Sequence, residues 1–384
     1  MISYGKQSIT QADVDAVVAV LNSDWLTQGP KVPEFERAIC DYVDCQYAVA
    51  VNSATSALHI ACLALQVGEN DLVWTSPISF VASSNCALYC GAKVDFVDIE
   101  PNTGNMCAKA LEAKLAHAKT MNQLPKVVIP VHLAGQTCDM EYISKLSKIY
   151  GFSIIEDASH AIGGKYYDKP IGSCTYSDIT IFSFHPVKVM TSAEGGVALT
   201  NNSALARQMQ MLRSHGVTAE DDEMTEPSHG PWYYQQVCLG FNYRMTDLHA
   251  ALGLSQLKKV DSFVTRRHQL ANIYNQLLDS RLVTPLNQVD NRYSAYHLYI
   301  ILLNEPNKTL HHTLVSGLRD KGIIGHVHYI PIHLQPYYKE MGFKPGEFPN
   351  AERYYQSAVT LPLHPDLTQD QVKYVVKTVH DILG

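Results

Sequence analysis

The chain has 384 residues, 46% of them hydrophobic and 17% charged, so it can bury a sizeable core, and its length indicates two domains. The formal net charge of -7 provides no general basic field for nucleic acid. No apolar run approaches the ~18 residues that a spanning helix needs. The N-terminus also lacks an apolar signal core, so neither membrane insertion nor secretion is expected. Nine scattered cysteines without a Cys-x-x-Cys pair are typical of the reducing cytoplasm.

The first predicted element is a helix over 10–22. Thr10 and Asp13 resemble a capping box there, and Val14, Val17 and Leu21 recur at helical spacing. After a loop, DWLTQGPKV, short apolar strands alternate with stretches of helical period such as 57–65 and 140–150. This alternation predicts an α/β fold in which a mostly parallel sheet is covered by helices on both faces. The predicted strands are 47–52, 72–75, 94–97, 127–131, 153–156, 180–183 and 197–199.

The second part of the chain departs from this alternation. An acidic, polar stretch over 220–230 is interpreted as a mobile loop or excursion. A long helix over 246–278 is expected to lead into a smaller C-terminal α+β domain, with strands over 296–303 and 326–330 and a closing helix over 369–383. The predicted division is a large domain over 1–245, which includes the N-terminal segment, and a small domain over 246–384.

The most informative segment is SFHPVKVMTSAEGG, residues 183–196, which places Lys188 after a strand in apolar surroundings. Burial lowers the pKa of a lysine and frees its amine to form a Schiff base, although an isolated lysine here would more simply be a surface charge. Asp157 follows another strand in IIEDASHA, and NSATSALH opens a helix with serine and threonine. These segments and Phe80 all lie just past strand ends, where ligands gather in parallel sheets. Together they predict a site for pyridoxal phosphate.

Motifs along nearly the whole chain extend this interpretation. They are GKQSIT, DWLTQGPKVPEFE, NSATSALH, TSPISFVASSN, CGAKVDFVDI, EDASHA, SFHPVK, GFNYRMTD and VHYIPIHLQPYY. In their order and number they resemble the sugar aminotransferases of the DegT/DnrJ/EryC1/StrS family. The resemblance implies fold type I, pyridoxal 5'-phosphate (PLP) as cofactor, and a homodimer with a shared active site.

The same resemblance implies that Lys188 and Asp157 are the catalytic residues. Lys188 would form the Schiff base with the cofactor and move a proton between cofactor and substrate carbon. Asp157 would keep the pyridine nitrogen protonated, whereas its position alone fits helix capping equally well. Glu156 should point to the other side of the strand end.

The phosphate of the cofactor is assigned to a helix N-terminus. By resemblance Thr55 and Ser56 contact it and Ser183 adds a hydroxyl, while plain N-capping by 53–56 is the alternative. Asn242, in GFNYRM, would reach the phosphate across the subunit boundary, so that each active site would need two chains.

Two ring side chains are implied to contact the cofactor ring. Phe80 matches the aromatic residue that stacks on it, with core packing as the alternative. His160 would hydrogen-bond the 3'-oxygen of the cofactor, with a packed helix histidine as the alternative. His185 is not assigned a role.

Substrate contacts are implied for several segments, with Lys31 and Arg244 as further cation candidates for a pyrophosphate and ordinary surface charge as the alternative. His326 and His328 form a His-x-His without a fitting carboxylate, so no metal is expected. The implied substrate contacts are Lys6, Leu26, Thr27, Gln28, Gly29, Ser56, Ser183, Asn242, Val327, His328, Tyr329 and Ile330.

The expected activity is amination of a UDP-linked 4-keto-6-deoxy-N-acetylhexosamine with L-glutamate as amino donor, as in pseudaminic acid biosynthesis. The substrate, the donor and the pathway come only from the resemblance. One rival is a sugar dehydratase of the same fold, which carries histidine at the position of Lys188. A second rival is a sugar-nucleotide sensor without turnover. No Gly-x-Gly-x-x-Gly follows a strand, so a nicotinamide site is not supported.

Overall fold

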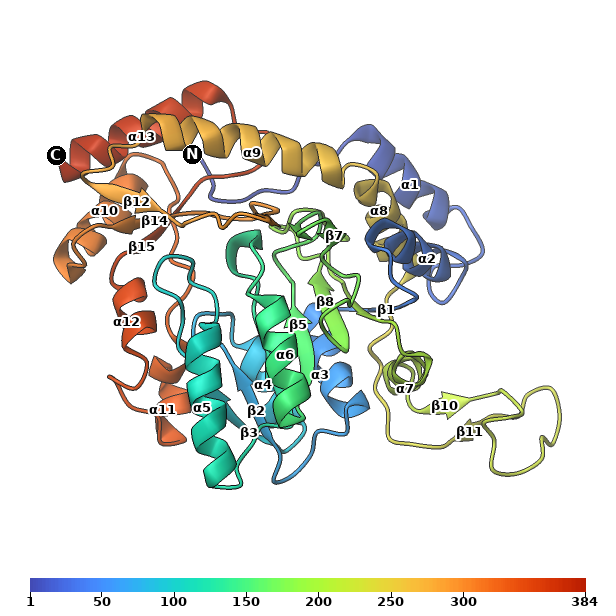
Figure 1. Ribbon diagram of the computed structural model, residues 1–384. Helices are drawn as coiled ribbons and strands as arrows, with labels where there is room; N and C mark the ends of the chain where they lie inside the picture. Colours follow the sequence, from blue (N-terminus) through green and yellow to red (C-terminus); the bar gives the residue numbers. More distant parts are fainter.

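The computed structural model describes residues 1–384, and its centre is a seven-stranded sheet with the strand order β1-β9-β8-β5-β4-β2-β3 (Figure 1). Strand β9 runs antiparallel to both of its neighbours, whereas β8, β5, β4, β2 and β3 pair in parallel. All seven predicted strands are therefore confirmed, with ends that differ by at most two residues. The strands are β1 (Tyr47–Val51), β2 (Leu72–Thr75), β3 (Lys93–Phe96), β4 (Val127–Ile129), β5 (Ser153–Asp157), β8 (Ile179–Ser183) and β9 (Gly196–Thr200).

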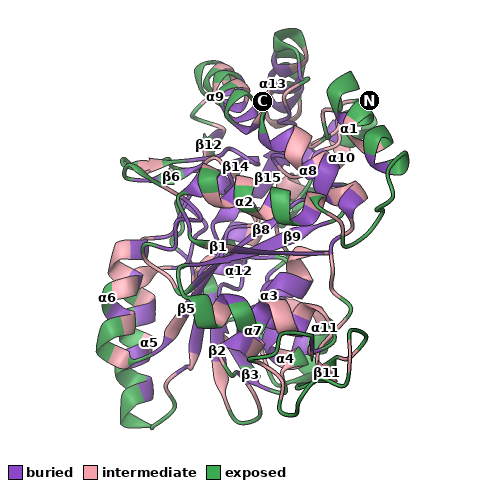
Figure 2. Ribbon diagram, turned by 90° about the vertical axis from the view of Figure 1, so that its right-hand side faces the viewer, coloured by how far each residue is buried: buried purple, intermediate pink, exposed green.

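Helices cover both faces of this sheet, and the strands between them are buried (Figure 2). Val127 and Ile129 of β4 face a core that includes α3 and α4, whereas Val128 faces a core with α5 and α6. Strands that are buried on both faces are mostly apolar, which explains the near-continuous apolar runs of β1, β4 and β9. The helices around the sheet are α3 (Ala54–Ala64), α4 (Ala82–Tyr89), α5 (Ala108–Thr120), α6 (Met140–Tyr150) and α7 (Ser203–Arg213), with a 3-10 turn η1 (Leu133–Gly135).

The N-terminal helices α1 (Gln11–Leu21) and α2 (Lys31–Val43) pack against α8 (Asp247–Leu257). The capping box of Thr10 and Asp13 is present at the start of α1. The single long helix predicted over 246–278 is wrong, because α8 ends at Leu257 and α9 (Val260–Leu277) begins after a break. Buried Asp13 accepts from Ser255, Gln256 and Lys259 around this break, with the Lys259 Nζ at 2.5 Å, and so holds the chain there.

Beyond the break, α9 crosses from one core to the next. Val264 packs with residues of the large sheet, whereas Leu270 and Tyr274 pack in a separate C-terminal core. That core is built on the sheet β12-β14-β15 and on α10 and α13, and the closing helix predicted over 369–383 is confirmed. The division into 1–245 and 246–384 stays a prediction. The C-terminal elements are β12 (Val283–Pro285), β14 (Tyr299–Leu303), α10 (Lys308–Asp320), η2 (Ile332–Leu334), α11 (Pro336–Glu340), α12 (Pro349–Tyr355), β15 (Ala358–Leu361) and α13 (Gln369–Leu383).

Two strand predictions in the C-terminal part need correction. The strand predicted over 296–303 begins only at Tyr299, because Ala295 and Leu298 donate to the turn at Gly135 and Ala134 instead. The strand predicted over 326–330 is wrong, since only His326 pairs with β15, as an isolated bridge to Thr360. The hydroxyl of Tyr354 donates to the carbonyl oxygen of His328 at 2.9 Å, so this carbonyl accepts from a side chain and not from a neighbouring strand.

The acidic stretch over 220–230 lies between β10 (Val217–Thr218) and β11 (Gln235–Gln236), a hairpin that projects away from the rest of the molecule (Figure 1). We call this hairpin and the residues that directly follow it, 217–239, the arm. It carries large apolar side chains in exposed positions, among them Trp232, which is 73% exposed, and Leu239, which is 78% exposed. Three further short strands form a small sheet, β6 (Lys165–Tyr166), β7 (Lys169–Pro170) and β13 (Arg292–Tyr293). None of the helices combines the length and apolarity that a membrane span requires.

Candidate active site

A cavity of about 460 Å³ lies at the carboxyl ends of the parallel strands. It gathers side chains from segments far apart in the sequence, because β5, β8 and the start of α3 meet at the same edge of the sheet. Of the residues predicted for the site, it is lined by Thr55, Phe80, Asp157, His160, Ser183, Lys188, His328 and Tyr329.

Lys188 lies in the loop that connects β8 to β9, on a turn in which its N–H donates to the carbonyl of His185 at 2.9 Å. The next two residues of the chain, Val189 and Met190, are buried, whereas the cavity around Lys188 also presents Asp157 and His160. Burial lowers the pKa of Lys188 to about 8, against an opposing effect of the negative charge of Asp157. A substantial fraction of the amine is therefore neutral near physiological pH and can act as a nucleophile.

The carboxylate of Asp157, at the end of β5, is held in one orientation by three hydrogen bonds. Ser83 donates to Oδ2 at 2.6 Å, and the hydroxyl and N–H of Ser159 donate to Oδ1 at 2.6 and 3.1 Å. Ser83 is joined in turn to Ser79 at 2.6 Å. Sequence reasoning missed this serine support, because Ser83 and Asp157 are 74 residues apart in the sequence.

The neighbouring Glu156 points away from the cavity, as its place on the strand predicts. Its Oε2 lies 2.7 Å from Nε2 of buried His132, and Ser177 donates to Oε1 at 2.5 Å. These partners lower the pKa of Glu156 against the opposing effect of its burial. Because its carboxylate is occupied by His132 and Ser177, Glu156 is not available to a ligand.

The start of α3 has the geometry of an anion site. Ser53 is the N-cap, and its Oγ accepts the N–H of Ser56 at 3.1 Å. The N–H groups of Ala54 and Thr55 have no partner within the helix, and the positive end of the helix dipole lies here. Ser56 itself is buried and donates to Asn52 at 2.6 Å, so it does not line the cavity.

Strand β9 approaches this helix start very closely at Gly196. A Cβ at that position would lie 2.5 Å from the N of Ala54 and 2.6 Å from the carbonyl carbon of Ser53. Only glycine allows this contact between the two backbones. The glycine therefore fixes where the free N–H groups of α3 sit at the end of the sheet.

The two predicted ring contacts differ in their surroundings. Phe80 is 61% exposed at the cavity, so it is not a core residue. His160 is buried with both ring nitrogens occupied: Nδ1 accepts the N–H of Ala134 at 3.3 Å and Nε2 lies 3.1 Å from the hydroxyl of Tyr329. Tyr4, Glu194 and His297 also line the cavity and were not foreseen, since nothing in their local sequence sets them apart.

Other predicted contacts lie outside this cavity in the single chain. Lys6 and Asn242 are exposed, and Lys31 forms a surface ion pair with Glu34 at 2.6 Å. Val327 and Ile330 flank the two residues of their segment that line the cavity. Leu26 is exposed, and Thr27 forms an isolated bridge to Thr246.

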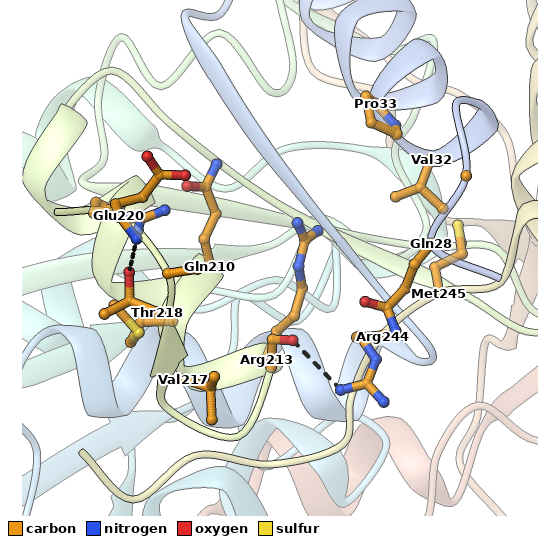
Figure 3. Close-up of a pocket in the computed structure, with 15 residues that line it drawn as sticks. Gln28, Val32, Pro33, Gln210, Arg213, Val217, Thr218, Glu220, Arg244 and Met245 are labelled. Carbon is orange, nitrogen blue, oxygen red and sulfur yellow. Dashed lines mark hydrogen bonds between the residues drawn. The ribbon is translucent and has the colours of Figure 1, made fainter. Parts of the chain in front are cut away.

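Gln28 and Gly29 line a second cavity of about 430 Å³ together with Arg244 (Figure 3). Arg244 donates to the hydroxyl of Ser214 at 3.4 Å and forms no ion pair. Two other arginines of this cavity are paired, Arg213 with Glu36 and Arg207 with Glu223. The structure thus gathers predicted site residues in two places, one around Lys188 and one around Arg244.

The residues of the first cavity fit pyridoxal phosphate. They supply an amine with a lowered pKa for its aldehyde, a fixed carboxylate for its ring nitrogen, an aromatic face, and a helix N-terminus with a hydroxyl from Ser183 for its phosphate. His326 and His328 have ring centroids 4.5 Å apart, but no group of three His, Cys, Asp or Glu side chains is arranged to hold a metal ion. Fold and site together define a PLP-dependent enzyme of fold type I.

Comparison with known proteins identifies the family to which the chain belongs. The family model of the DegT/DnrJ/EryC1/StrS aminotransferases matches residues 7–380, and the chain belongs to this family. It is 38% identical over 389 residues to the UDP-4-amino-4,6-dideoxy-N-acetyl-beta-L-altrosamine transaminase of Campylobacter jejuni, covering 100% of this chain and 98% of that protein. The protein is therefore a PLP-dependent enzyme of the sugar aminotransferase class.

Solved structures agree with this assignment. Helicobacter pylori PseC, an aminotransferase involved in the biosynthesis of pseudoaminic acid, matches with a TM-score of 0.90 and 32% identity over 100% of this chain and 99% of that chain. The putative sugar aminotransferase Spr1654 from Streptococcus pneumoniae, in its PMP-form, matches with a TM-score of 0.91 and 31% identity over 100% and 99%. The fold type expected from the sequence is thus confirmed.

Proposed function

We propose that this enzyme transfers an amino group from L-glutamate to the ketone of a UDP-linked 4-keto-6-deoxy-N-acetylhexosamine, as a step of pseudaminic acid biosynthesis. The observation that carries the aminotransferase chemistry is the meeting of Lys188, Asp157 and the start of α3 in one cavity. The choice of sugar is supported by the similarity to the C. jejuni transaminase and to H. pylori PseC. The choice of glutamate rests on the family resemblance.

In this proposal the residues of the cavity divide the contacts to the cofactor among them. The N–H groups of Ala54 and Thr55 and the hydroxyl of Ser183 hold its phosphate, Phe80 stacks on its ring, and Asp157 keeps its ring nitrogen protonated. When bound, pyridoxal phosphate supplies an electron-accepting ring that stabilises negative charge on the carbon next to the transferred nitrogen.

Lys188 is the proposed proton carrier. Its amine has a pKa of about 8, so both its neutral and its charged forms are accessible at physiological pH. It can therefore take a proton from the carbon of the amino donor and return one to the sugar carbon.

The sugar nucleotide is proposed to reach the cavity from its open side. Residues 327–330 and Lys6 would contact the sugar, and Arg244, as a cation without an ion pair, is suited to a diphosphate. We further propose that a second copy of the chain completes the site through Asn242. This residue is exposed and lies outside its own chain's cavity, a few residues after the projecting arm.

The visible spectrum of the protein with pyridoxal phosphate, recorded before and after addition of L-glutamate, tests the proposal. We expect an absorbance band that requires Lys188, is lost with glutamate and returns when the UDP-linked 4-keto sugar is added. The Lys188→Ala variant should fold and show no such band. A band that ignores glutamate would contradict the proposed donor.

The product decides between the proposed reaction and its rivals. An amino sugar of the expected mass supports the transfer, whereas a product that has lost a hydroxyl and gained no nitrogen would identify a dehydratase. Binding of the sugar nucleotide without consumption of glutamate would identify a sensor. Related keto sugars with another nucleotide or another ketone position serve as the matched comparison for substrate choice.

A further inference from the structure

The hydrogen bonds of His160 fix where its proton lies. The N–H of Ala134 points at Nδ1 over 3.3 Å, so Nδ1 must be the unprotonated, accepting nitrogen. Burial, together with the nearby charge of Lys188, lowers the pKa of His160 well below its ordinary value, so the ring is neutral. The single ring proton is therefore on Nε2, which donates to the hydroxyl oxygen of Tyr329 at 3.1 Å.

The turn that supplies this N–H is tightly built. Ala134 adopts a left-handed conformation with φ 58°, and Gly135 follows with φ 105°. A Cβ on Gly135 would lie 3.0 Å from the carbonyl oxygen of His160 and 2.9 Å from the N of Tyr296. The turn, His160 and the start of the C-terminal part are thus in close contact, which leaves the histidine ring little freedom.

The hydroxyl of Tyr329 has one hydrogen of its own and gives it to no group of the chain, since His160 is its only hydrogen-bond partner. Burial and the nearby negative charge of Asp157 raise the pKa of this phenol far above its ordinary value, so it stays protonated. Both Tyr329 and His160 line the cavity of Lys188. The hydrogen is therefore available to an acceptor inside that cavity.

We propose that Tyr329 donates a hydrogen bond to a negatively charged oxygen of the bound ligand, and that His160 is the positioning residue that orients this hydroxyl. The inference rests on the proposed function. The oxygen is either the ring oxygen of the cofactor or the ketone oxygen of the sugar as it gains charge. The proposed role of Tyr329 differs from the sequence-based expectation that His160 itself contacts the 3'-oxygen, because both ring nitrogens of His160 already have partners.

The Tyr329→Phe variant tests the proposal with two readouts. The first is a pH titration of the absorbance of the bound cofactor without any sugar or donor. Loss of a hydrogen bond to a charged oxygen destabilises the anionic form, so the midpoint should rise by about one pH unit if the acceptor is on the cofactor. The second is the single-turnover rate of the amine-loaded enzyme with the keto sugar, which should fall at least tenfold if the acceptor is on the sugar.

Variants of His160 test the positioning role. His160→Leu should reproduce the effect of Tyr329→Phe in the affected readout, and adding it to Tyr329→Phe should cause little further change. His160→Gln can accept from Ala134 and donate to Tyr329, so it should restore part of the effect. Tyr274→Phe is the matched control, because that hydroxyl donates to the carbonyl of Pro362 in the C-terminal core at 2.9 Å.

Four outcomes decide the matter. A shifted titration assigns the acceptor to the cofactor, and a slowed sugar step with an unshifted titration assigns it to the sugar; both support the proposal. A Tyr329→Phe enzyme that binds the cofactor and matches wild type in both readouts overturns the inference while leaving the proposed function intact. A wild-type protein that binds no pyridoxal phosphate overturns both.

Discussion

Lys188 shows how much of the site depends on the surroundings of one side chain. Burial removes hydration from its amine and only the negative charge of Asp157 compensates, so its charged form is disfavoured in the folded protein. An ordinary exposed lysine would be almost wholly charged at pH 7. The burial of Lys188 thus prepares the nucleophile before any ligand arrives.

The first prediction concerns the pH dependence of cofactor loading. The rate at which the protein without cofactor captures pyridoxal phosphate should increase with pH and level off above about 8, because the neutral amine is the reacting form and the pKa of Lys188 is about 8. Stopped-flow absorbance at fixed cofactor concentration measures this rate. A midpoint near 10.5, the ordinary lysine value, would contradict the effect assigned to burial.

The same pKa shift predicts an effect on stability. Because the folded-state pKa lies below the unfolded value of 10.5, the unfolded chain binds more protons between pH 8 and 10.5, and folding is opposed most below about pH 8. Without cofactor, Lys188→Met should therefore be more stable than wild type at pH 7, by about 2 kcal/mol after allowance for partial exposure. Urea unfolding should show this gain shrinking as the pH rises from 8 to 10.5; a loss of stability at pH 7 would contradict it.

The elements that build the site were accessible to sequence reasoning to different degrees. Most strands of the central sheet are buried on both faces, so their apolar runs stand out, and all seven strands were predicted. Residues 326–330 were also predicted as a strand, but the carbonyl oxygen of His328 accepts a hydrogen bond from the hydroxyl of Tyr354. That tyrosine is 26 residues away in the sequence, and such a contact has no local signal.

The residues of the site also divide into those with a local sequence signal and those that depend on long-range contacts. Lys188 and Asp157 follow strand ends and could be predicted from position and residue type. Their supports could not, since Ser83 reaches Asp157 over 74 residues and Ala134 reaches His160 over 26. Long-range contacts of this kind depend on how elements pack, and a single sequence carries little information on that packing.

The contact between β9 and α3 gives a prediction at the scale of elements. Gly196→Ala would place a Cβ against the backbone of Ser53 and Ala54 and push the helix start away from the sheet. We expect the affinity for pyridoxal phosphate to fall at least tenfold, with a loss of about 1–3 kcal/mol in stability. Gly68→Ala is the control, because a Cβ added there would have no atom within 4 Å. Equal affinity of the two variants, measured by fluorescence titration, would show that this contact does not set the phosphate site.

At the scale of the whole molecule, two features of the single chain point to a second copy. The arm of β10 and β11 projects from the body with Trp232, Tyr234 and Leu239 exposed, although an isolated two-stranded hairpin is only marginally stable in water. Asn242, at the base of this arm, is exposed and reaches no ligand site of its own chain. A symmetric dimer would cover the arm and could bring each Asn242 to the partner's cavity.

Mixed dimers test whether Asn242 acts on the partner's site. Lys188→Ala and Asn242→Ala chains, each expected to be nearly inactive alone, are coexpressed with different tags. If Asn242 serves the partner, a mixed dimer has one site with both defects and one intact site, so random assembly should restore about a quarter of wild-type activity. If Asn242 serves its own chain, both sites of a mixed dimer are defective and nothing is restored. Lys188→Ala with Asp157→Asn is the matched control, because both residues line the cavity of one chain and the mixture should stay inactive.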